Sequence, residues 1–191
     1  MAGRFGTDGI RGRVGDEVTA DLALALGRAV GSRLAGHGST VVVGRDTRRS
    51  GEMLVAALTA GLAGTGTDTV DLGIVTTPCL VHASCDPRYA AGIMISASHN
   101  PAPDNGLKVV VGGRKADDRT EAELDALIDA AASGDAPNDR LGRLQADPDA
   151  IERYLGHLSE VAGSTFDGLR IGLDCANGSA SGVAPALFRS L

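Results

Sequence analysis

Apolar residues recur at two different spacings along the N-terminal two thirds of the chain. Helical spacing of Leu, Ala and Val predicts one helix over residues 20–35 and another over 51–63, with Thr19 and Ser50 as their N-caps. Between and after them lie short apolar runs without alternation, as expected of strands that are buried on both faces of a sheet. Such strands are predicted at residues 40–43, 69–72, 92–95 and 107–111.

Two further helices complete this part of the pattern. Residues 78–84 predict a short helix with proline at its first position. Residues 120–132 predict a longer one, in which Thr120 and Glu123 form a capping box. Because strands separated by helices are typical of βαβ units, we expect a three-layer α/β/α domain with a mostly parallel, mixed sheet over residues 1–132.

The pattern changes after this domain. Residues 133–147 are rich in Gly, Pro, Asn and Asp and predict a linker. Asp147 is then expected to cap a helix that begins with a proline, and a strand at 169–174 and a helix at 178–190 follow. Because one strand and one helix cannot bury a core alone, residues 148–191 are expected to be a connecting helix and the truncated beginning of a second α/β domain.

Composition argues against several functional classes. The formal net charge is -6, without the basic face that nucleic-acid binding needs. No apolar run approaches the roughly 18–20 residues of a membrane span, and the N-terminus lacks a signal-peptide core, so a cytoplasmic protein without a membrane partner is expected. Cys79, Cys85 and Cys175 match no zinc pattern and are expected to be reduced and mostly buried.

Two segments between these elements are unusually polar and rich in glycine. Residues 5–12 (Phe-Gly-Thr-Asp-Gly-Ile-Arg-Gly) include Arg11, whose guanidinium is suited to phosphate. Residues 44–51 (Gly-Arg-Asp-Thr-Arg-Arg-Ser-Gly) follow a strand and precede a helix, where α/β sheets place ligands and helix N-termini favour anions. Two interpretations stay open for this second segment. Its arginines, Arg45 among them, bind an anion, or Asp46 pairs with the arginines and holds two loops together.

A third polar segment, residues 95–108, leaves the end of a predicted buried strand and carries a candidate nucleophile. Ser98 is followed by His99, a stiffening proline, and an Asn-Gly turn that leads to Lys108. Adjacent Ser and His side chains seldom align, and the nucleophile elbow Gly-x-Ser-x-Gly is absent here, which disfavours a serine hydrolase. A serine hydroxyl needs activation or an already installed phosphate. A plain turn rich in Ser and Asn is the structural alternative.

Together these segments resemble the α-D-phosphohexomutase superfamily, which includes phosphoglucomutases, phosphomannomutases and phosphoglucosamine mutases. The family's serine loop, Ser/Thr-Ala-Ser-His-Asn-Pro followed by Asn-Gly-x-Lys, is matched at every position by residues 96–101 and 105–108. Residues 5–12 resemble the phosphoglucosamine mutase branch most closely. The Gly-Arg-Asp-Thr-Arg segment and residues 174–178 also fit. The resemblance extends over essentially the whole chain, but over less than half of a typical four-domain member.

The resemblance implies an isomerase that moves a phosphoryl group within a sugar phosphate. Such an enzyme interconverts a hexose 1-phosphate and a hexose 6-phosphate, here most closely glucosamine phosphate. A hexose 1,6-bisphosphate serves as intermediate and activator. By position, Ser98 carries the phosphate as a phosphoserine and is also the ligand through which this chain contacts Mg²⁺. The structural implication is a first domain that presents this serine to a small-molecule sugar phosphate.

The other site residues implied by the resemblance surround this serine. Lys108 and Arg11 supply positive charge, and Lys108 takes part in acid–base transfer at the sugar hydroxyl. His99 shapes the loop or contacts the phosphate. Asn100 and Arg45 are expected to bind substrate.

Parts of the family pattern are absent from this sequence. These are the magnesium loop Asp-Gly-Asp-x-Asp-Arg, the sugar-reading loop Gly-Glu-x-Ser-Gly-His and the phosphate-clamping loop Arg-x-Ser-Gly-Thr. We therefore expect the missing domains II–IV in the same or another chain, and no mutase turnover by this chain alone. Phosphoglucomutase or phosphomannomutase activity, and a non-catalytic module that binds phosphosugars, stay open as alternatives.

Overall fold

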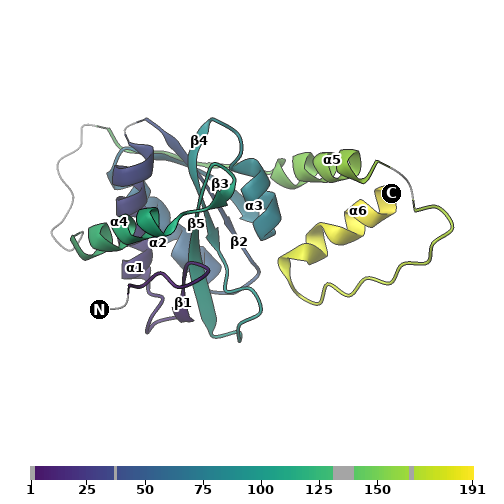
Figure 1. The fold of residues 1–191 in the computed structure, drawn as a ribbon, viewed down its shortest axis with the longest axis horizontal. Coiled ribbons are helices and arrows are strands. Elements are labelled where there is room, and N and C mark those ends of the chain that lie inside the picture. Colours follow the sequence, from purple (N-terminus) through teal and green to yellow (C-terminus); the bar gives the residue numbers. More distant parts are fainter. Residues whose placement is uncertain (1–2, 37, 131–139, 164–165) are drawn as a thin grey trace.

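A computed structural model describes residues 3–36, 38–130, 140–163 and 166–191, and Figure 1 shows their fold. The strands are β1 (Ile10–Arg13), β2 (Thr40–Arg45), β3 (Asp68–Ile74), β4 (Tyr89–Ile95), β5 (Asp104–Val111), β6 (Arg114–Lys115) and β7 (Leu144–Ala146). The helices are α1 (Ala20–Val30), α2 (Gly51–Gly64), α3 (Thr77–Ala83), α4 (Asp118–Ala130), α5 (Ala150–Ala162) and α6 (Ala184–Ser190). A π-helical turn, Gly31–Ala35, continues α1, and a 3₁₀ turn, Ser179–Gly182, precedes α6.

The sheet is mixed, in the order β1-β5-β4-β2-β3-β7, with β6 paired to β5. Strands β4, β2, β3 and β7 run parallel, whereas β5 is antiparallel to both β4 and β1. Strand β5 runs antiparallel to β4 because a short loop, residues 96–103, joins the two, and a parallel partner would need a longer crossover. The prediction of a three-layer domain with a mostly parallel, mixed sheet is confirmed.

Each face of the sheet has its own hydrophobic core. Val41 and Val43 pack with α1 and α2, whereas Val42 points to the opposite face and packs with residues of α3 and α5. Helix α4 joins the first layer through its contact with α1 (Figure 1). Helices α1 and α2 approach each other closely, since a Cβ on Gly27 or Gly61 would lie 2.2 Å from a carbonyl oxygen of the other helix. The predicted strands are therefore buried on both faces, as their sequence pattern indicates.

The helix caps are only partly as predicted. Thr19 caps α1 by accepting a hydrogen bond from a backbone N–H of the first turn. The Ser50 hydroxyl makes no capping bond to α2 and instead accepts one from Asn105 Nδ2 at 2.8 Å. The capping box at Thr120 is also wrong, because α4 begins earlier and the Thr120 N–H donates to Asp117 Oδ1. At α2 the predicted cap is bonded to strand β5, and at α4 Asp117 accepts from the first turn in place of Thr120.

The expected linker at residues 133–147 is not free of regular structure. Residues 131–139 lie outside the described part, but β7 follows them and pairs with β3 along the edge of the sheet. Asp68 at the start of β3 anchors this segment, because its carboxylate accepts hydrogen bonds from the Arg140 side chain and the Arg143 backbone. A short, fully exposed edge strand has no hydrophobic pattern from which it could be predicted.

Helix α5 covers the second face of the domain from outside α3. Its expected cap, Asp147, is wrong, because the N-cap position belongs to Asp149 and the Asp147 carboxylate binds Arg153 instead. The helix packs against α3, where the rings of His82 and His157 stack at a centroid distance of 4.2 Å. Burial, and then the nearby His157, lower the pKa of His82.

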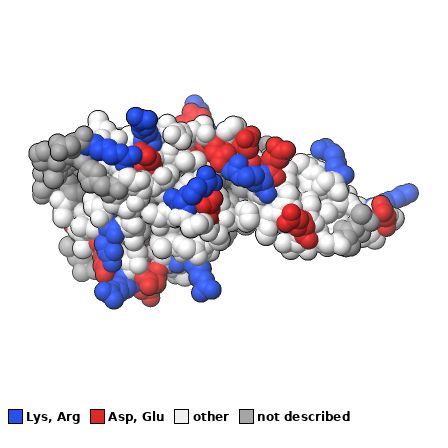
Figure 2. Space-filling view, turned by 90° about the horizontal axis from the view of Figure 1, so that it is seen from above, with Lys and Arg blue, Asp and Glu red and all other residues white. Residues whose placement is uncertain are grey.

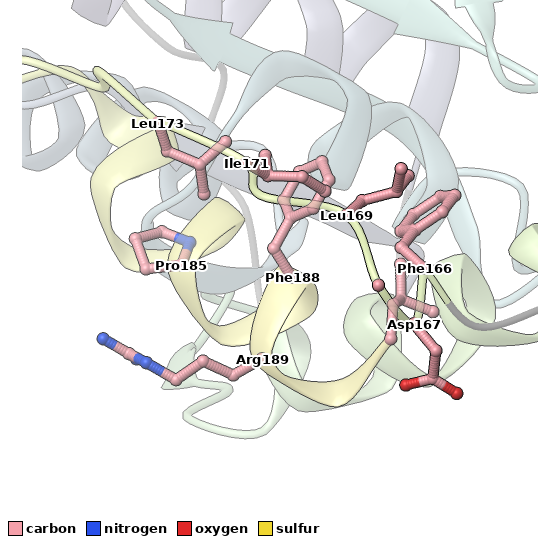
Figure 3. A pocket seen from close by; sticks show the side chains of 10 residues that line it. Phe166, Asp167, Leu169, Ile171, Leu173, Pro185, Phe188 and Arg189 are labelled. Atoms are coloured by element: carbon pink, nitrogen blue, oxygen red, sulfur yellow. The ribbon is translucent and has the colours of Figure 1, made fainter.

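The C-terminal part extends past α5 and then returns beneath it, where Val183 joins the second core and the Thr47 hydroxyl donates to Asn177 O at 2.7 Å (Figure 1). The predicted strand at 169–174 is wrong in this structure, because no described strand lies beside it to accept its hydrogen bonds. Its apolar side chains Leu169, Ile171 and Leu173 stay largely exposed and line a shallow hollow with Phe188 of α6 (Figure 3). The predicted helix at 178–190 forms as the 3₁₀ turn followed by α6. The division into a first domain at 1–132 and a second beginning at 148 stays a prediction.

The surface has mixed charge on the face that Figure 2 shows, where basic and acidic side chains alternate. No helix among the described residues is long and apolar enough to cross a membrane. Of the three cysteines only Cys79 is buried, and burial raises the pKa of its thiol to about 11. Cys85 is exposed and Cys175 half-buried, so the expectation of mostly buried thiols is wrong for these two.

Candidate active site

The polar segments meet in a row across the end of the sheet. Asp46, directly after β2, donates its N–H to Ile95 O of β4 at 3.0 Å. The Ser96 N–H donates to Gly106 O of β5 at 2.9 Å, and Gly106 is the register partner of Arg11 on β1. Because side chains at neighbouring positions of adjacent strands point to the same face, Asp46, Ser96 and Arg11 share one face of the sheet.

The lack of a side chain at Gly106 leaves space for the Arg11 side chain in this row. A Cβ on Gly106 would lie 2.8 Å from Ser96 O and 3.0 Å from Arg11 Cγ, so the stem of Arg11 lies over the glycine. The neighbouring Asn105 is fully buried and bonds to the Ser50 hydroxyl at the start of α2. The predicted Asn-Gly turn is wrong, since both residues lie inside β5. Asn105 and Gly106 instead belong to the first part of β5, directly after the serine loop.

Ser98 lies on the surface of the loop that joins β4 to β5. Its φ of 55° is in the left-handed region, which costs a non-glycine residue about 1 kcal/mol or more. Its N–H donates to Ser96 Oγ at 3.0 Å, and its Oγ lies 3.5 Å from Nδ1 of the exposed His99. Asn100 turns back on the loop and donates from Nδ2 to Asp104 Oδ2. The serine hydroxyl therefore points out of a turn whose backbone is held in place.

Lys108 and Arg11, which we call the cation pair, share one carboxylate. Lys108 Nζ lies 2.7 Å from Asp8 Oδ2, and Arg11 Nη2 donates to the same oxygen. Burial by itself would raise the pKa of Asp8. The hydrogen bond and charge of Lys108, together with the charge and hydrogen bond of Arg11, outweigh burial and hold that pKa below its usual range. Asp8 is therefore ionised at neutral pH and partly neutralises both cations. Sequence analysis did not identify it, although it lies in the polar segment that carries Arg11.

Arg48 is the second residue that sequence analysis did not single out. Its guanidinium donates from Nε to Asp46 Oδ2 at 3.1 Å. Its two terminal nitrogens donate, at 2.7–2.9 Å, to the backbone carbonyl oxygens of Ser98, Asn100, Pro101 and Asp104. Arg48 therefore binds the serine loop from one end to the other.

The structure agrees with the second interpretation of residues 44–51, in which Asp46 pairs with an arginine and holds two loops together. Asp46 Oδ2 also accepts a hydrogen bond from Ser96 Oγ at 2.7 Å, so the carboxylate joins Arg48 to the serine loop. Arg45, the expected substrate contact, lies elsewhere. Since consecutive strand residues point to opposite faces, its side chain packs over Gly51 at the start of α2 and pairs with Glu52 at 3.4 Å. The structure does not bring Arg45 to the face that bears Ser96 and Arg11.

The described residues do not form a complete metal site. Within them, no group of three or more His, Cys, Asp or Glu side chains converges on a point where an ion could sit. The two carboxylates of the row, Asp46 and Asp8, are each engaged by cations. The expected role of Ser98 as a magnesium ligand stays a prediction.

Comparisons with known proteins agree with this arrangement. A family model described as phosphoglucomutase/phosphomannomutase, alpha/beta/alpha domain I, matches residues 2–135. The chain belongs to this family. Matches that cover the whole chain also include residues 174–178, which lie beyond the family model.

Over its whole length the chain is 46% identical to a phosphoglucosamine mutase of Rhodococcus jostii and 45% identical to one of Mycolicibacterium gilvum. It spans 44% of the length of each. A phosphoglucomutase/phosphomannomutase family protein of Burkholderia thailandensis superposes on 95% of the chain with a TM-score of 0.78 at 31% identity, and the chain covers 40% of it. Parafusin, a Paramecium phosphoglucomutase in its open form, matches with a TM-score of 0.72 at 16% identity, which shows the fold alone. There the match spans 100% of this chain and 42% of parafusin.

Proposed function

We propose that this chain is the phosphoryl-carrying part of a phosphohexomutase, with Ser98 as the carrier. One observation supports this most directly. The Ser98 hydroxyl is exposed on a fixed turn, two residues beyond the row in which Arg11 lies over Gly106. Lys108 lies two residues further along β5, on the same face of the sheet as Gly106. A phosphate on Ser98 would thus stand at the end of the sheet that bears both members of the cation pair.

The proposed transfer proceeds in two matched steps. A hydroxyl oxygen of the sugar phosphate attacks the phosphorus of phosphoserine 98, and the bond from phosphorus to Ser98 Oγ breaks. The hydroxyl proton passes to an oxygen of the transferring phosphoryl group or to solvent as the new bond forms, and Oγ takes up a proton from Lys108 Nζ as its bond breaks. The bisphosphate then turns over, and the same exchange in reverse returns its other phosphoryl group to Oγ. Positioning and charge neutralisation are the main sources of catalysis in such transfers.

The cation pair supplies the charge for both steps. A phosphoserine carries about -2 charge near neutral pH, which competes with the Asp8 carboxylate for Lys108 and Arg11. The Lys108 ammonium is also a proton donor for Oγ as the bond to phosphorus breaks. His99, exposed beside Ser98, and Asn100, bonded within the loop, contact the phosphate or shape the turn.

The remaining parts of the enzyme lie outside this sequence in the proposal. When bound, Mg²⁺ would neutralise charge on the phosphoryl oxygens of Ser98, with its other ligands supplied by a further domain. Domains II–IV would bind the sugar and its second phosphate. The chain alone is therefore proposed to carry phosphate without mutase turnover, and a hexose 1,6-bisphosphate would load it.

The proposed substrate is glucosamine phosphate. Phosphoglucosamine mutases of Rhodococcus and Mycolicibacterium are 44–46% identical over essentially the entire chain. Glucose and mannose phosphates are the competing substrates. Because the family's sugar-reading loop is absent from this sequence, substrate choice is tested by turnover.

The decisive experiment is phosphate transfer to Ser98. For it, the chain is extended with the C-terminal part of the Rhodococcus jostii relative, and we call this protein the extended enzyme. Incubation with glucose 1,6-bisphosphate should add about 80 Da to the Ser98 peptide by mass spectrometry, in line with a single phosphoryl group. The Ser98→Ala variant should gain nothing and lose turnover. A coupled assay with the three hexose 1-phosphates then ranks the substrates. Wild-type turnover by Ser98→Ala would refute the carrier assignment.

A further inference from the structure

Arg48 closes a ring of hydrogen bonds through the backbone of Ser98. The ring runs from Arg48 Nη2 to Ser98 O at 2.8 Å and from the Ser98 N–H to Ser96 Oγ at 3.0 Å. It continues from Ser96 Oγ to Asp46 Oδ2 at 2.7 Å and returns through Arg48 Nε, which donates to that oxygen at 3.1 Å. Arg48 therefore holds the Ser98 carbonyl directly, and Asp46 holds the Ser98 N–H through the Ser96 hydroxyl. We call Arg48, Asp46 and Ser96 the Arg48 cluster.

The cluster also accounts for the unusual backbone of the carrier. Ser98 has a positive φ of 55°, which persists only where the surroundings impose it. The other carbonyls that Arg48 binds belong to Asn100, Pro101 and Asp104, so the loop cannot relax on its far side. A lysine could not replace this fork, because one ammonium has three donors and no planar geometry.

Arg48 has little capacity left for a substrate. Its donors are used by protein carbonyls and by Asp46, and the side chains of both Arg48 and Asp46 are only 12% exposed. Its charge is balanced by that carboxylate. An arginine close to a phosphoryl site would ordinarily be assigned to phosphate binding, but this one faces the protein backbone.

We propose that Arg48 is a positioning residue for phosphoryl transfer, which sets the direction of Ser98 Oγ through the Arg48 cluster. The inference rests on the proposed function of Ser98 as carrier. In-line transfer requires the donor and acceptor oxygens to be aligned, and a misplacement of about 1 Å can cost on the order of 100-fold in rate. Loss of Arg48 therefore slows the transfer step, while binding of the sugar phosphate by the other domains stays.

The test uses the extended enzyme with Arg48→Met, and Arg49→Met as the matched control. Arg49 is the exposed neighbour in the same loop, so its substitution removes the same charge without touching the ring. We expect Arg48→Met to lower kcat by about 100-fold, with KM changed by less than about threefold, since positioning acts on the transfer step. Arg49→Met should stay within about twofold of the parent. Arg48→Lys should recover only part of the loss.

A chemical rescue separates positioning from loss of the fold. In Arg48→Ala, guanidinium at about 50 mM can occupy the vacated space and should restore kcat by about tenfold, whereas Lys108→Ala should not respond. Circular dichroism of each variant checks that the fold persists. Should Arg48→Met misfold, the kcat and KM of folded Arg48→Lys keep the inference open to refutation, because lysine keeps the charge and loses the planar fork.

The outcomes distinguish this inference from the proposed function. The rate at which glucose 1,6-bisphosphate phosphorylates Ser98 is measured by mass spectrometry in the parent and in Arg48→Met. If the parent never gains phosphate, the carrier assignment fails and this inference fails with it. If the parent gains phosphate and folded Arg48→Met gains it equally fast, or if the loss falls on KM alone, only the positioning role of Arg48 is overturned.

Discussion

The Arg48 cluster and the cation pair lie at the same end of the sheet but use positive charge differently. The Arg48 side chain is 12% exposed, and its partners are a carboxylate of equal burial and a set of backbone carbonyls. Lys108 is buried to a similar degree, yet it shares with Arg11 a single carboxylate, Asp8, whose side chain is 48% exposed. Burial of the cation alone therefore does not distinguish the two sites.

The difference lies in what each cation would lose by changing partner. Arg48 could not turn to a phosphate without leaving backbone carbonyls unsatisfied, and each such loss costs about 1–3 kcal/mol. Lys108 and Arg11 need only exchange one half-exposed carboxylate for a phosphate with more charge and more acceptor oxygens. The half-exposed Asp8 carboxylate can return to solvent when a phosphate takes its cations, so this exchange leaves no buried group unsatisfied. This difference supports our proposals that Arg48 belongs to the scaffold and that the cation pair binds the phosphate.

The largest effect is expected for Lys108→Met. This change removes an ammonium that we assign to charge neutralisation and to proton transfer at Ser98 Oγ. Loss of one preorganised donor at a reacting oxygen typically costs about 100-fold or more in kcat. Steady-state turnover of the extended enzyme measures the loss, and circular dichroism should show an unchanged fold because Met preserves the buried stem. Turnover within tenfold of the parent would mean that Lys108 neither neutralises charge nor transfers a proton at Ser98 Oγ.

A smaller effect is expected for Arg11→Met. Arg11 shares its role with Lys108, and it stands on the edge strand β1 with Asp8 as its hydrogen-bond partner. We expect kcat to fall by about tenfold, since one of two cations remains at the phosphate. The phosphorylation rate of Ser98, followed by mass spectrometry, should fall in parallel. Unchanged rates would mean that Arg11 serves only to hold Asp8 and the N-terminal loop.

Much of the fold could be predicted from the sequence because the core strands are uniformly apolar. The β2 segment illustrates this, with Val41, Val42 and Val43 fully buried between two helical layers. The pattern failed where burial does not decide the structure. Strand β7 is exposed along its length and follows from hydrogen bonds to Asp68. The segment 169–174 has the pattern of a strand, but strand formation also requires a neighbour.

Only some residues of the candidate site could be named from the sequence. Ser98, Lys108 and Arg11 are named through the resemblance to the family's motifs, whereas Asp8 and Arg48 are not identified and Arg45 lies elsewhere. The roles of Arg45 and Arg48 could not be separated, because both are arginines of one charged loop. The alternation of side chains along strands places Asp46 and Ser96 on the same face of the sheet. That the Arg48 guanidinium reaches the Ser98 carbonyl is seen only in the structure.

The smallest effect, and the most direct probe of the comparison, is expected for Asp8→Asn. Without the carboxylate, the cation pair is free for an added anion. We expect the unphosphorylated extended enzyme to bind sulfate about two- to fivefold more tightly, in keeping with the modest free energy of a half-exposed ion pair. Isothermal titration calorimetry measures the affinity, and sulfate is chosen because it stays a dianion over the range studied. Weaker sulfate binding by Asp8→Asn would show that Asp8 orients the cations instead of occupying their anion site.

The pH dependence of this difference tests the cause. Because Lys108 and Arg11 lower the pKa of Asp8, its carboxylate in the parent protein stays ionised at neutral and mildly acidic pH. A carboxylate with a lowered folded pKa keeps its ion pair above the unfolded value and loses it only as pH falls through the folded pKa. The affinity ratio between Asp8→Asn and the parent should therefore be constant from about pH 8 to about pH 5 and shrink only in stronger acid. A ratio that already shrinks between pH 7 and pH 5 would mean that the pKa of Asp8 is raised because burial outweighs the cation pair, and the exchange of carboxylate for phosphate would lose its basis.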